Sequence, residues 1–274
     1  MTKTRIGITI LKVKNLAIML DFYQHIIGLK LITQQENRAH LGVGDTTLLI
    51  LNEDLAARPV KRVTGLYHFA LLVPERYQLA LALKHFAETQ TPLQGMSDHI
   101  VSEAIYLADP EGNGIEIYWD KPRERWYKNG EMQLATLPMD VAGVLSELNE
   151  RDTTWQGLPD GTTIGHIHLH VANLPENEQF YSVLLGLDVM FNMGSASFLS
   201  YDDYHHHIGI NIWAGSAAPP TDATGLQHFN LHLTDDEYDI AVARLQNIKI
   251  SMETIEQGIQ VIDPTGNQIK LIYI

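Results

Sequence analysis

Residues 109–116 read Asp-Pro-Glu-Gly-Asn-Gly-Ile-Glu, and the same turn returns as Asp-Pro-Thr-Gly-Asn at residues 263–267, 154 positions later. Other pairs recur at nearly the same distance. Asn-Leu, Phe-Tyr and Gly-Leu, which begin at Asn15, Phe22 and Gly28, return 158 positions later at Asn173, Phe180 and Gly186. Gly65-Leu66 and His68-Phe69 return after 160 positions as Gly225-Leu226 and His228-Phe229. Three offsets so close together indicate a duplicated architecture with small insertions and deletions.

The smaller building block is a β-α-β-β-β module. Residues 6–13 have a strand pattern, Asn15 is a good helix N-cap, and the apolar residues that follow keep helical spacing up to Gly28, a left-handed C-cap. Strand-like runs then occupy 29–34, 38–43 and 46–51. The pattern restarts near residues 64, 163 and 224. The sequence therefore predicts an α+β fold built from four such modules.

We predict two domains joined by a linker. The linker is too long for a simple loop, and part of it has a helical pattern. The predicted boundaries are 1–120 for the first pair of modules (about 5–53 and 62–120), 121–161 for a crossing linker with a possible helix at 140–149, and 162–274 for the second pair (about 163–214 and 224–274).

Composition limits the class of protein. The chain has 274 residues, of which 45% are apolar and 19% charged, as in ordinary globular proteins. The absence of cysteine excludes disulfides, thiolate metal ligands and a cysteine nucleophile. A net charge of −14 argues against nucleic acid as a partner. Met1–Arg5 leads into no cleavage-like site, and no apolar run reaches the ~20 residues of a membrane span, so we expect a cytoplasmic protein with no membrane partner.

The module pattern resembles that of the vicinal oxygen chelate superfamily, which includes glyoxalase I, extradiol dioxygenases and bleomycin-resistance proteins. The resemblance rests on the β-α-β-β-β unit, on Phe-Tyr followed by Gly-Leu, and on the ending at 109–116, and it covers nearly the whole chain except 120–161. Four modules in one chain, with residues 102–107 before the turn, look most like the catechol-2,3-dioxygenase and hydroquinone-dioxygenase branch. The resemblance implies that modules pair into two half-open sheet cups that can hold a divalent metal.

In this superfamily the metal ligands come from two slots per module, one on the first strand and one on the last. From module one to module four, the first-strand slots hold Ile8, His68, His166 and His228, and the last-strand slots hold Ile50, Glu116, Asn211 and Lys270. An ammonium group has no lone pair and repels a cation, so the pairing of modules three and four is poor. Modules two and three combine two imidazoles with one carboxylate, the set that leaves open positions on non-haem Fe(II).

This pairing predicts His68, Glu116 and His166 as the ligands of Fe(II), with Mn(II) as the alternative, and it places modules one and four in the other cup. The linker is long enough to bring module three beside module two in one chain, and the same pairing could form between the subunits of a homodimer. Taken alone, each histidine could instead be a core residue whose ring nitrogens are hydrogen-bonded. His228 is expected to be structural or vestigial.

The resemblance also implies a catalytic tyrosine. Tyr106 lies ten residues before Glu116, where extradiol dioxygenases have a tyrosine that faces the substrate. The two residues belong to strands joined by the Asp-Pro turn, so they are expected to lie close together. Packing is the alternative role for Tyr106. His99, seven residues before Tyr106, is a weaker site candidate, because the family's extra histidine lies about nine before.

A catalytic histidine is implied by the segment Asp202-Asp203-Tyr204-His205-His206-His207. It resembles the family's His-His pair, whose second member handles the proton in ring cleavage. The role then falls on His206, with His205 and His207 as alternative registers. Three adjacent histidines near a strand cannot all face one side, because side chains alternate. A solvated turn is the structural alternative.

The function implied by the resemblance is an extradiol-type dioxygenase that cleaves the ring of a small aromatic diol, a catechol or hydroquinone, with O₂. One alternative is a glyoxalase-like metalloenzyme, although glyoxalase I usually fills four ligand slots and Asn211 supplies no second carboxylate. The other is a metal-free protein that binds or sequesters a small molecule. The chain has no glycine-rich dinucleotide or phosphate loop, so no nucleotide cofactor site is predicted.

Overall fold

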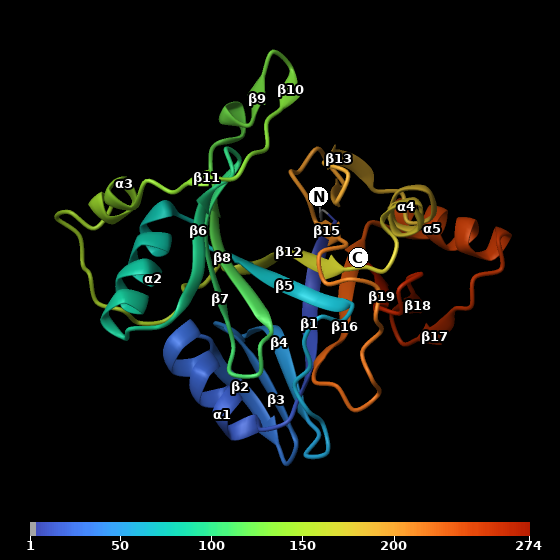
Figure 1. The fold of residues 1–274 in the computed structure, drawn as a ribbon, viewed down its shortest axis with the longest axis horizontal. Coiled ribbons are helices and arrows are strands. Elements are labelled where there is room, and N and C mark those ends of the chain that lie inside the picture. The colour runs from blue at the N-terminus through green and yellow to red at the C-terminus, as the bar shows by residue number, and fades with distance from the viewer. Residues whose placement is uncertain (1–3) are drawn as a thin grey trace.

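The structure, a computed structural model, describes residues 4–274, so the first three residues of the N-terminal segment discussed above lie outside it. Two large mixed sheets form the molecule (Figure 1). One has eight strands in the order β17-β18-β19-β16-β1-β4-β3-β2, and the other has nine in the order β11-β6-β7-β8-β5-β12-β15-β14-β13. The predicted α+β fold of four β-α-β-β-β modules is confirmed.

Each module has the predicted order of one strand, one helix and three strands. Module one contains β1 (Arg5–Val13), α1 (Leu16–Asp21) with a π-helical continuation over Phe22–Ile27, β2 (Lys30–Gln35), β3 (Arg38–Val43) and β4 (Thr46–Glu53). Module two contains β5 (Gly65–Leu72), α2 (Arg76–Glu88), β6 (Leu93–Asp98), β7 (Ser102–Ala108) and β8 (Gly114–Asp120). Module three contains β12 (Thr163–His170), α4 (Leu174–Gln179) with a π-helical continuation over Phe180–Leu184, β13 (Asp188–Asn192), β14 (Ala196–Ser200) and β15 (Ile208–Asn211). Module four contains β16 (Gly225–Leu233), α5 (Asp235–Asn247), β17 (Glu253–Ile255), β18 (Gly258–Ile262) and β19 (Gln268–Tyr273).

The two sheets combine modules from opposite halves of the chain. β1 pairs antiparallel with β16 and so joins modules one and four, while β5 pairs antiparallel with β12 and joins modules two and three. Within a module the first strand also runs parallel to the last, as β5 does with β8. The predicted pairing of modules is confirmed, and it forms within a single chain. The division of the chain into domains at residues 120 and 162 stays a prediction.

The repeated Phe-Tyr and Asp-Pro motifs meet in space. The hydroxyl of Tyr23 in module one donates a hydrogen bond of 2.8 Å to Oδ2 of Asp109 in module two. The duplicate bond, from Tyr181 in module three to Asp263 in module four, is also 2.8 Å long. All four side chains are buried. Each Asp-Pro turn is therefore bonded to the helical segment of the module before it, which holds neighbouring modules in a fixed arrangement.

We expect Tyr23→Phe to lower the free energy of unfolding by about 1–3 kcal/mol, because Asp109 stays buried with one hydrogen bond fewer. Asp109 is only 5% exposed, and burial already raises the pKa of its carboxyl above the ordinary value. Urea denaturation measures the change, and Tyr181→Phe should cost a similar amount. Wild-type stability in the Tyr23→Phe variant would show that this hydrogen bond makes no net contribution to the free energy of unfolding.

Residues 121–161 connect module two to module three, and one short strand of this segment lies at the edge of the nine-stranded sheet. The two-residue strand β11 (Leu137–Pro138) extends β6, and β9 (Tyr127–Lys128) pairs with β10 (Glu131–Met132) in a separate hairpin. The helix α3 (Val141–Ser146) lies within the predicted 140–149. No helix among residues 4–274 is long and apolar enough to cross a membrane.

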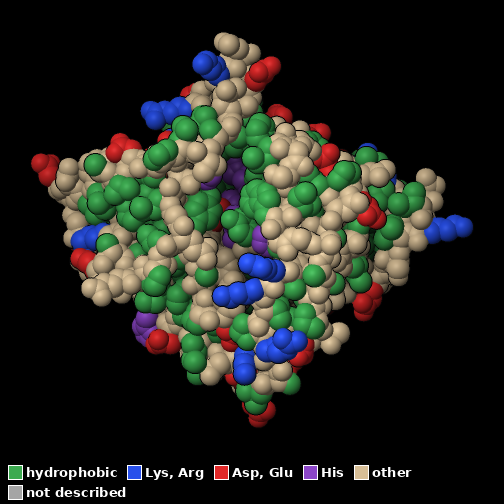
Figure 2. Space-filling view, in the orientation of Figure 1, with side chains coloured by type: hydrophobic (Ala, Val, Ile, Leu, Met, Phe, Trp, Pro, Cys, Tyr) green, Lys and Arg blue, Asp and Glu red, His purple; other side chains and the backbone are tan. Residues whose placement is uncertain are grey.

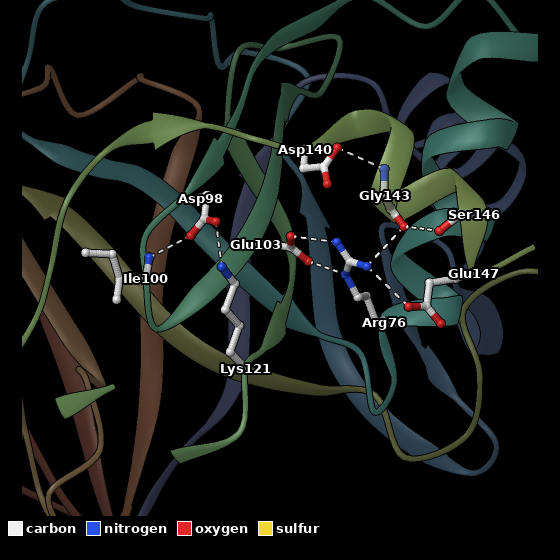
Figure 3. Close-up of polar contacts among 9 residues, drawn as sticks. All are labelled: Arg76, Asp98, Ile100, Glu103, Lys121, Asp140, Gly143, Ser146 and Glu147. Carbon is white, nitrogen blue, oxygen red and sulfur yellow. Dashed lines mark hydrogen bonds and ion pairs between the residues drawn. The ribbon is translucent and has the colours of Figure 1, made fainter. Parts of the chain in front are cut away.

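Arg76 of α2 connects the linker to the sheet (Figure 3). Its guanidinium donates to both carboxylate oxygens of Glu103 on β7, at 2.6 and 2.9 Å. It also donates to the carbonyl of Gly143 in α3 at 3.0 Å and to Glu147 at 3.2 Å. Since Glu103 is only 3% exposed, Arg76 is the counter-charge of a buried carboxylate as well as an anchor for α3.

Candidate metal centre

Three neighbouring strands bring the predicted ligands together. Glu116 lies on β8, His68 on β5 and His166 on β12, and these strands are adjacent in the order β8-β5-β12. Ala70 of β5 lies opposite both Glu116 and His166, and His68 is two residues earlier, hence on the same face. Because Ala70 carries only a methyl group, the longer side chains around it can converge.

The three donor atoms form a small triangle. Oε2 of Glu116 lies 3.0 Å from Nε2 of His68 and 3.0 Å from Nε2 of His166, and the two nitrogens are 3.3 Å apart. Two ligand atoms bound at right angles, each about 2.1 Å from one ion, lie about 3 Å apart. The donor set therefore fits a single divalent ion with further positions open. Among residues 4–274, this is the one cluster of three or more histidine and carboxylate side chains that could hold a metal ion.

The electrostatics of the triangle also favour a cation. Burial alone would raise the pKa of Glu116, but the charges and hydrogen bonds of His166 and His68 outweigh it and hold that pKa well below its ordinary value. Burial lowers the pKa of His166 to about 4, against the opposing effect of Glu116. At neutral pH the site thus presents a carboxylate and an imidazole lone pair, which are the protonation states that metal binding requires.

Tyr106 lies opposite Glu116 in the β7–β8 pair, as its position in the sequence suggested. Its hydroxyl is 2.7 Å from Nε2 of His99. Nδ1 of His99 is 2.8 Å from the carbonyl oxygen of Ala135, which can only accept, so Nδ1 carries the proton and Nε2 accepts from Tyr106. Burial and the charge of Glu116 raise the pKa of Tyr106 well above its ordinary value, so the phenol keeps its proton.

The three adjacent histidines are all buried, and each faces a different environment, so the alternative of a solvated turn is wrong. His206 lines the cavity described below, and its ring centroid lies 4.1 Å from that of His166. His205 turns away and approaches Asp120. His207 is bonded through Nδ1 to the hydroxyl of Ser200 at 2.8 Å.

A cavity of about 530 Å³ opens over the triangle. Figure 2 shows histidine side chains at the bottom of a hollow near the centre of one face, with hydrophobic side chains around it and Lys and Arg side chains grouped below. Its polar lining includes the triangle, Tyr106 and His99. Module three contributes an apolar wall made of Phe191, Met193, Phe198 and Trp213. An aromatic ring with polar substituents suits this mixed lining.

His168 and Asn211 have roles beside the cavity that the sequence did not predict. His168 is buried two residues after His166 and lines the cavity. Asn211 is turned toward two histidines: its Nδ2 donates to Nε2 of His168 at 3.0 Å, and its Oδ1 accepts from Nδ1 of His170 at 2.7 Å. Asn211 therefore orients His168 and His170, and both of its side-chain polar atoms already have partners. The alternation of histidines along residues 166–170 was a signal that all three face one side.

Among residues 4–274, the eight-stranded sheet holds no comparable donor set. His228 occupies the position that corresponds to His68, and Lys270 the position that corresponds to Glu116. Burial, with the nearby positive charges of Lys270 and Arg38, lowers the pKa of His228 to about 4. Within the described residues, no second metal ligand lies with this neutral imidazole, and two cations lie nearby. A structural or vestigial role for His228 is in line with this.

Comparison with known proteins gives a consistent picture. Residues 5–117 match the family described as the Glyoxalase/Bleomycin resistance protein/Dioxygenase superfamily. The chain is 42% identical over 273 residues to the catechol-2,3-dioxygenase of Bacillus subtilis (strain 168), which covers 96% of this chain and 95% of that protein.

Solved structures share the fold at low sequence identity. Glyoxalase I from Zea mays superposes with a TM-score of 0.61 at 12% identity, covering 99% of this chain and 92% of that one. The CppA protein of Streptococcus pneumoniae TIGR4 superposes with a TM-score of 0.60 at 14% identity, covering 98% of both chains. At these identities the structures support the fold alone.

Proposed function

This chain belongs to the Glyoxalase/Bleomycin resistance protein/Dioxygenase superfamily, and from that premise we propose that it is a metal-dependent extradiol dioxygenase that cleaves the ring of a small aromatic diol, a catechol in the first instance, with O₂. The observation that carries the proposal is the triangle of His68, Glu116 and His166 beneath a cavity with an apolar wall. The similarity to a catechol-2,3-dioxygenase runs through both halves of the chain and so through every strand of the site.

We propose Fe(II) as the ion held by His68, Glu116 and His166, with Mn(II) as the alternative. Such an ion supplies, when bound, open positions for the diol oxygens and for O₂ and a path for electrons between them. Glu116 contributes the negative charge that offsets the cation. The donor set argues against a glyoxalase-like site, because within the described part of the chain no second carboxylate joins the cluster. In a metal-free binding protein the buried carboxylate would have only the two imidazoles as partners, and Nδ1 of His166 would stay unpaired, which is costly.

The protein side chains bind the diol and move its protons. The apolar wall packs against the ring and excludes water. We assign His206 as the general base, since its ring borders both the cavity and His166. We assign Tyr106 to orienting the diol. Its proton is directed to His99, so its oxygen is free to accept a hydrogen bond from a substrate hydroxyl. Cytoplasmic location and homodimer formation stay predictions.

Oxygen consumption tests the proposed reaction. Protein purified without chelator should contain close to one equivalent of iron or manganese, and iron-reconstituted protein should consume one O₂ for each catechol and form a coloured ring-opened product. His206→Ala should lower kcat by about 10²–10⁴-fold with metal content unchanged. Full activity in His206→Ala would contradict the assignment of His206 as the general base. If the metal is fully bound and no catechol or hydroquinone supports oxygen uptake, the dioxygenase function is wrong and the glyoxalase-like alternative is favoured.

A further inference from the structure

His206 is connected to the outside of the molecule by a chain of short hydrogen bonds. Nδ1 of His206 lies 2.8 Å from Nδ1 of His205. Nε2 of His205 lies 2.8 Å from Oδ1 of Asp120, at the end of β8. His205 is fully buried, whereas the side chain of Asp120 is 21% exposed and borders a separate cavity of about 260 Å³. The chain of bonds therefore starts near solvent and ends at the candidate metal centre.

The directions of these bonds follow from the groups involved. A carboxylate can only accept, so Nε2 of His205 carries the proton that it shares with Asp120. With one proton on each ring, Nδ1 of His205 is then an acceptor, and Nδ1 of His206 must be the donor in the 2.8 Å contact. Nε2 of His206, on the far side of the ring, is left with its lone pair. It makes no hydrogen bond within residues 4–274.

Two tyrosines hold Asp120 in this role. The hydroxyl of Tyr204 donates to Oδ2 of Asp120 at 2.9 Å, which leaves Oδ1 for His205. Tyr118 is 2.7 Å from Tyr204, and because the proton of Tyr204 points to the carboxylate, Tyr118 is the donor. Tyr118 is fully buried and Tyr204 is half-buried, and the ring centroid of Tyr204 lies 4.1 Å from that of His205. The orientation of the carboxylate is thus set by packing as well as by hydrogen bonds.

We propose that Asp120 and His205 are positioning residues that fix the tautomer of His206, so that its Nε2 is the unprotonated atom presented to the substrate. The inference rests on the proposed function for the role of His206, but the tautomer itself belongs to the free protein. A base of this kind needs its lone pair directed at the proton it takes, and a histidine held in the wrong tautomer is ineffective even when its ring is in place.

Asp120→Asn provides the test, because an amide can offer N–H to Nε2 of His205. His205 then carries its proton on Nδ1 and donates to Nδ1 of His206, which moves the His206 proton to Nε2. In metal-free protein without substrate, ¹⁵N–¹H NMR of the imidazoles should show His206 protonated at Nδ1 in wild type and at Nε2 in Asp120→Asn. With iron and catechol, kcat should fall by about 100-fold or more while metal content is unchanged.

The matched control is Asp98→Asn, shown with its partners in Figure 3. Asp98 is a carboxylate of similar side-chain exposure, 23%, which bonds to Lys121 and to the backbone N–H of Ile100 and has no hydrogen bond to a histidine among residues 4–274. The Asp98→Asn variant should have the same His206 tautomer and the same kcat as the wild type. Finding His206 protonated at Nε2 in wild type overturns the proposal and needs no variant. An unchanged tautomer in a folded Asp120→Asn protein overturns it as well. If the NMR result holds but no diol is consumed, the dioxygenase function fails while the positioning of His206 stands.

Discussion

Glu116→Gln is expected to lower the affinity for the metal by at least about 100-fold and to reduce oxygen uptake to background. The change keeps the size of the side chain but removes the negative charge that lies 3.0 Å from both imidazole nitrogens. Loss of a group that only orients a ligand costs about 10–100-fold in metal affinity, so loss of the charged ligand itself should cost more. Metal content after dialysis against graded chelator concentrations measures the effect directly.

The second cup supplies the control for this experiment. His228→Gln changes a histidine at the matching position of the eight-stranded sheet, beside Lys270, where no carboxylate completes a site. It should keep both metal content and oxygen uptake. Full metal occupancy in Glu116→Gln, or loss of the metal in His228→Gln, would place the ion elsewhere and contradict the assignment.

Arg76→Met is expected to lower the free energy of unfolding by about 3–5 kcal/mol, the typical cost of leaving a buried charge without its partner. Glu103 is 3% exposed and receives two hydrogen bonds from Arg76, at 2.6 and 2.9 Å (Figure 3). The same change releases Gly143 and Glu147, and with them α3. For a chain of this size the melting midpoint should fall by roughly 6–20 °C.

An exposed arginine provides the matched control for Arg76. Arg58 pairs with Asp222 at 2.9 Å, but the two side chains are 58% and 48% exposed, so Arg58→Met should cost no more than about 1 kcal/mol. The double variant Arg76→Met with Glu103→Leu should recover part of the loss, since an apolar pair removes the unpaired charge. A cost below 1 kcal/mol for Arg76→Met alone would show that Glu103 finds another partner.

Local chemistry made much of the fold readable from the sequence. Asn15 accepts from the backbone N–H of Ile18 at the start of α1, and Gly28 ends the following turn with a φ of 84°, both as their residue types predicted. In the Asp-Pro turns, Asp109 accepts from the backbone N–H of Asn113, which lies four residues away. Such interactions join neighbours in the chain, so the residue types alone determine them.

The pairing of modules was also within reach of the sequence, because it followed from charge. Two imidazoles and one carboxylate can share a cation, whereas Lys270 cannot take part, and among the slots that the resemblance implies this singles out His68, Glu116 and His166. The resemblance to the superfamily supplied the two slots, the repeat located them in each module, and elementary electrostatics supplied the choice among them.

Tertiary structure alone decided the surroundings of the site. The bond from His99 to Ala135 and the path from His206 through His205 to Asp120 each join residues from different elements. Asn211 faces His168 because of the β12–β15 register, which no local pattern specifies. Such contacts depend on where the sheet curls and which rotamers its packing allows. The sequence therefore determined the modules and the charge of the site, whereas the orientation of each side chain came from long-range packing.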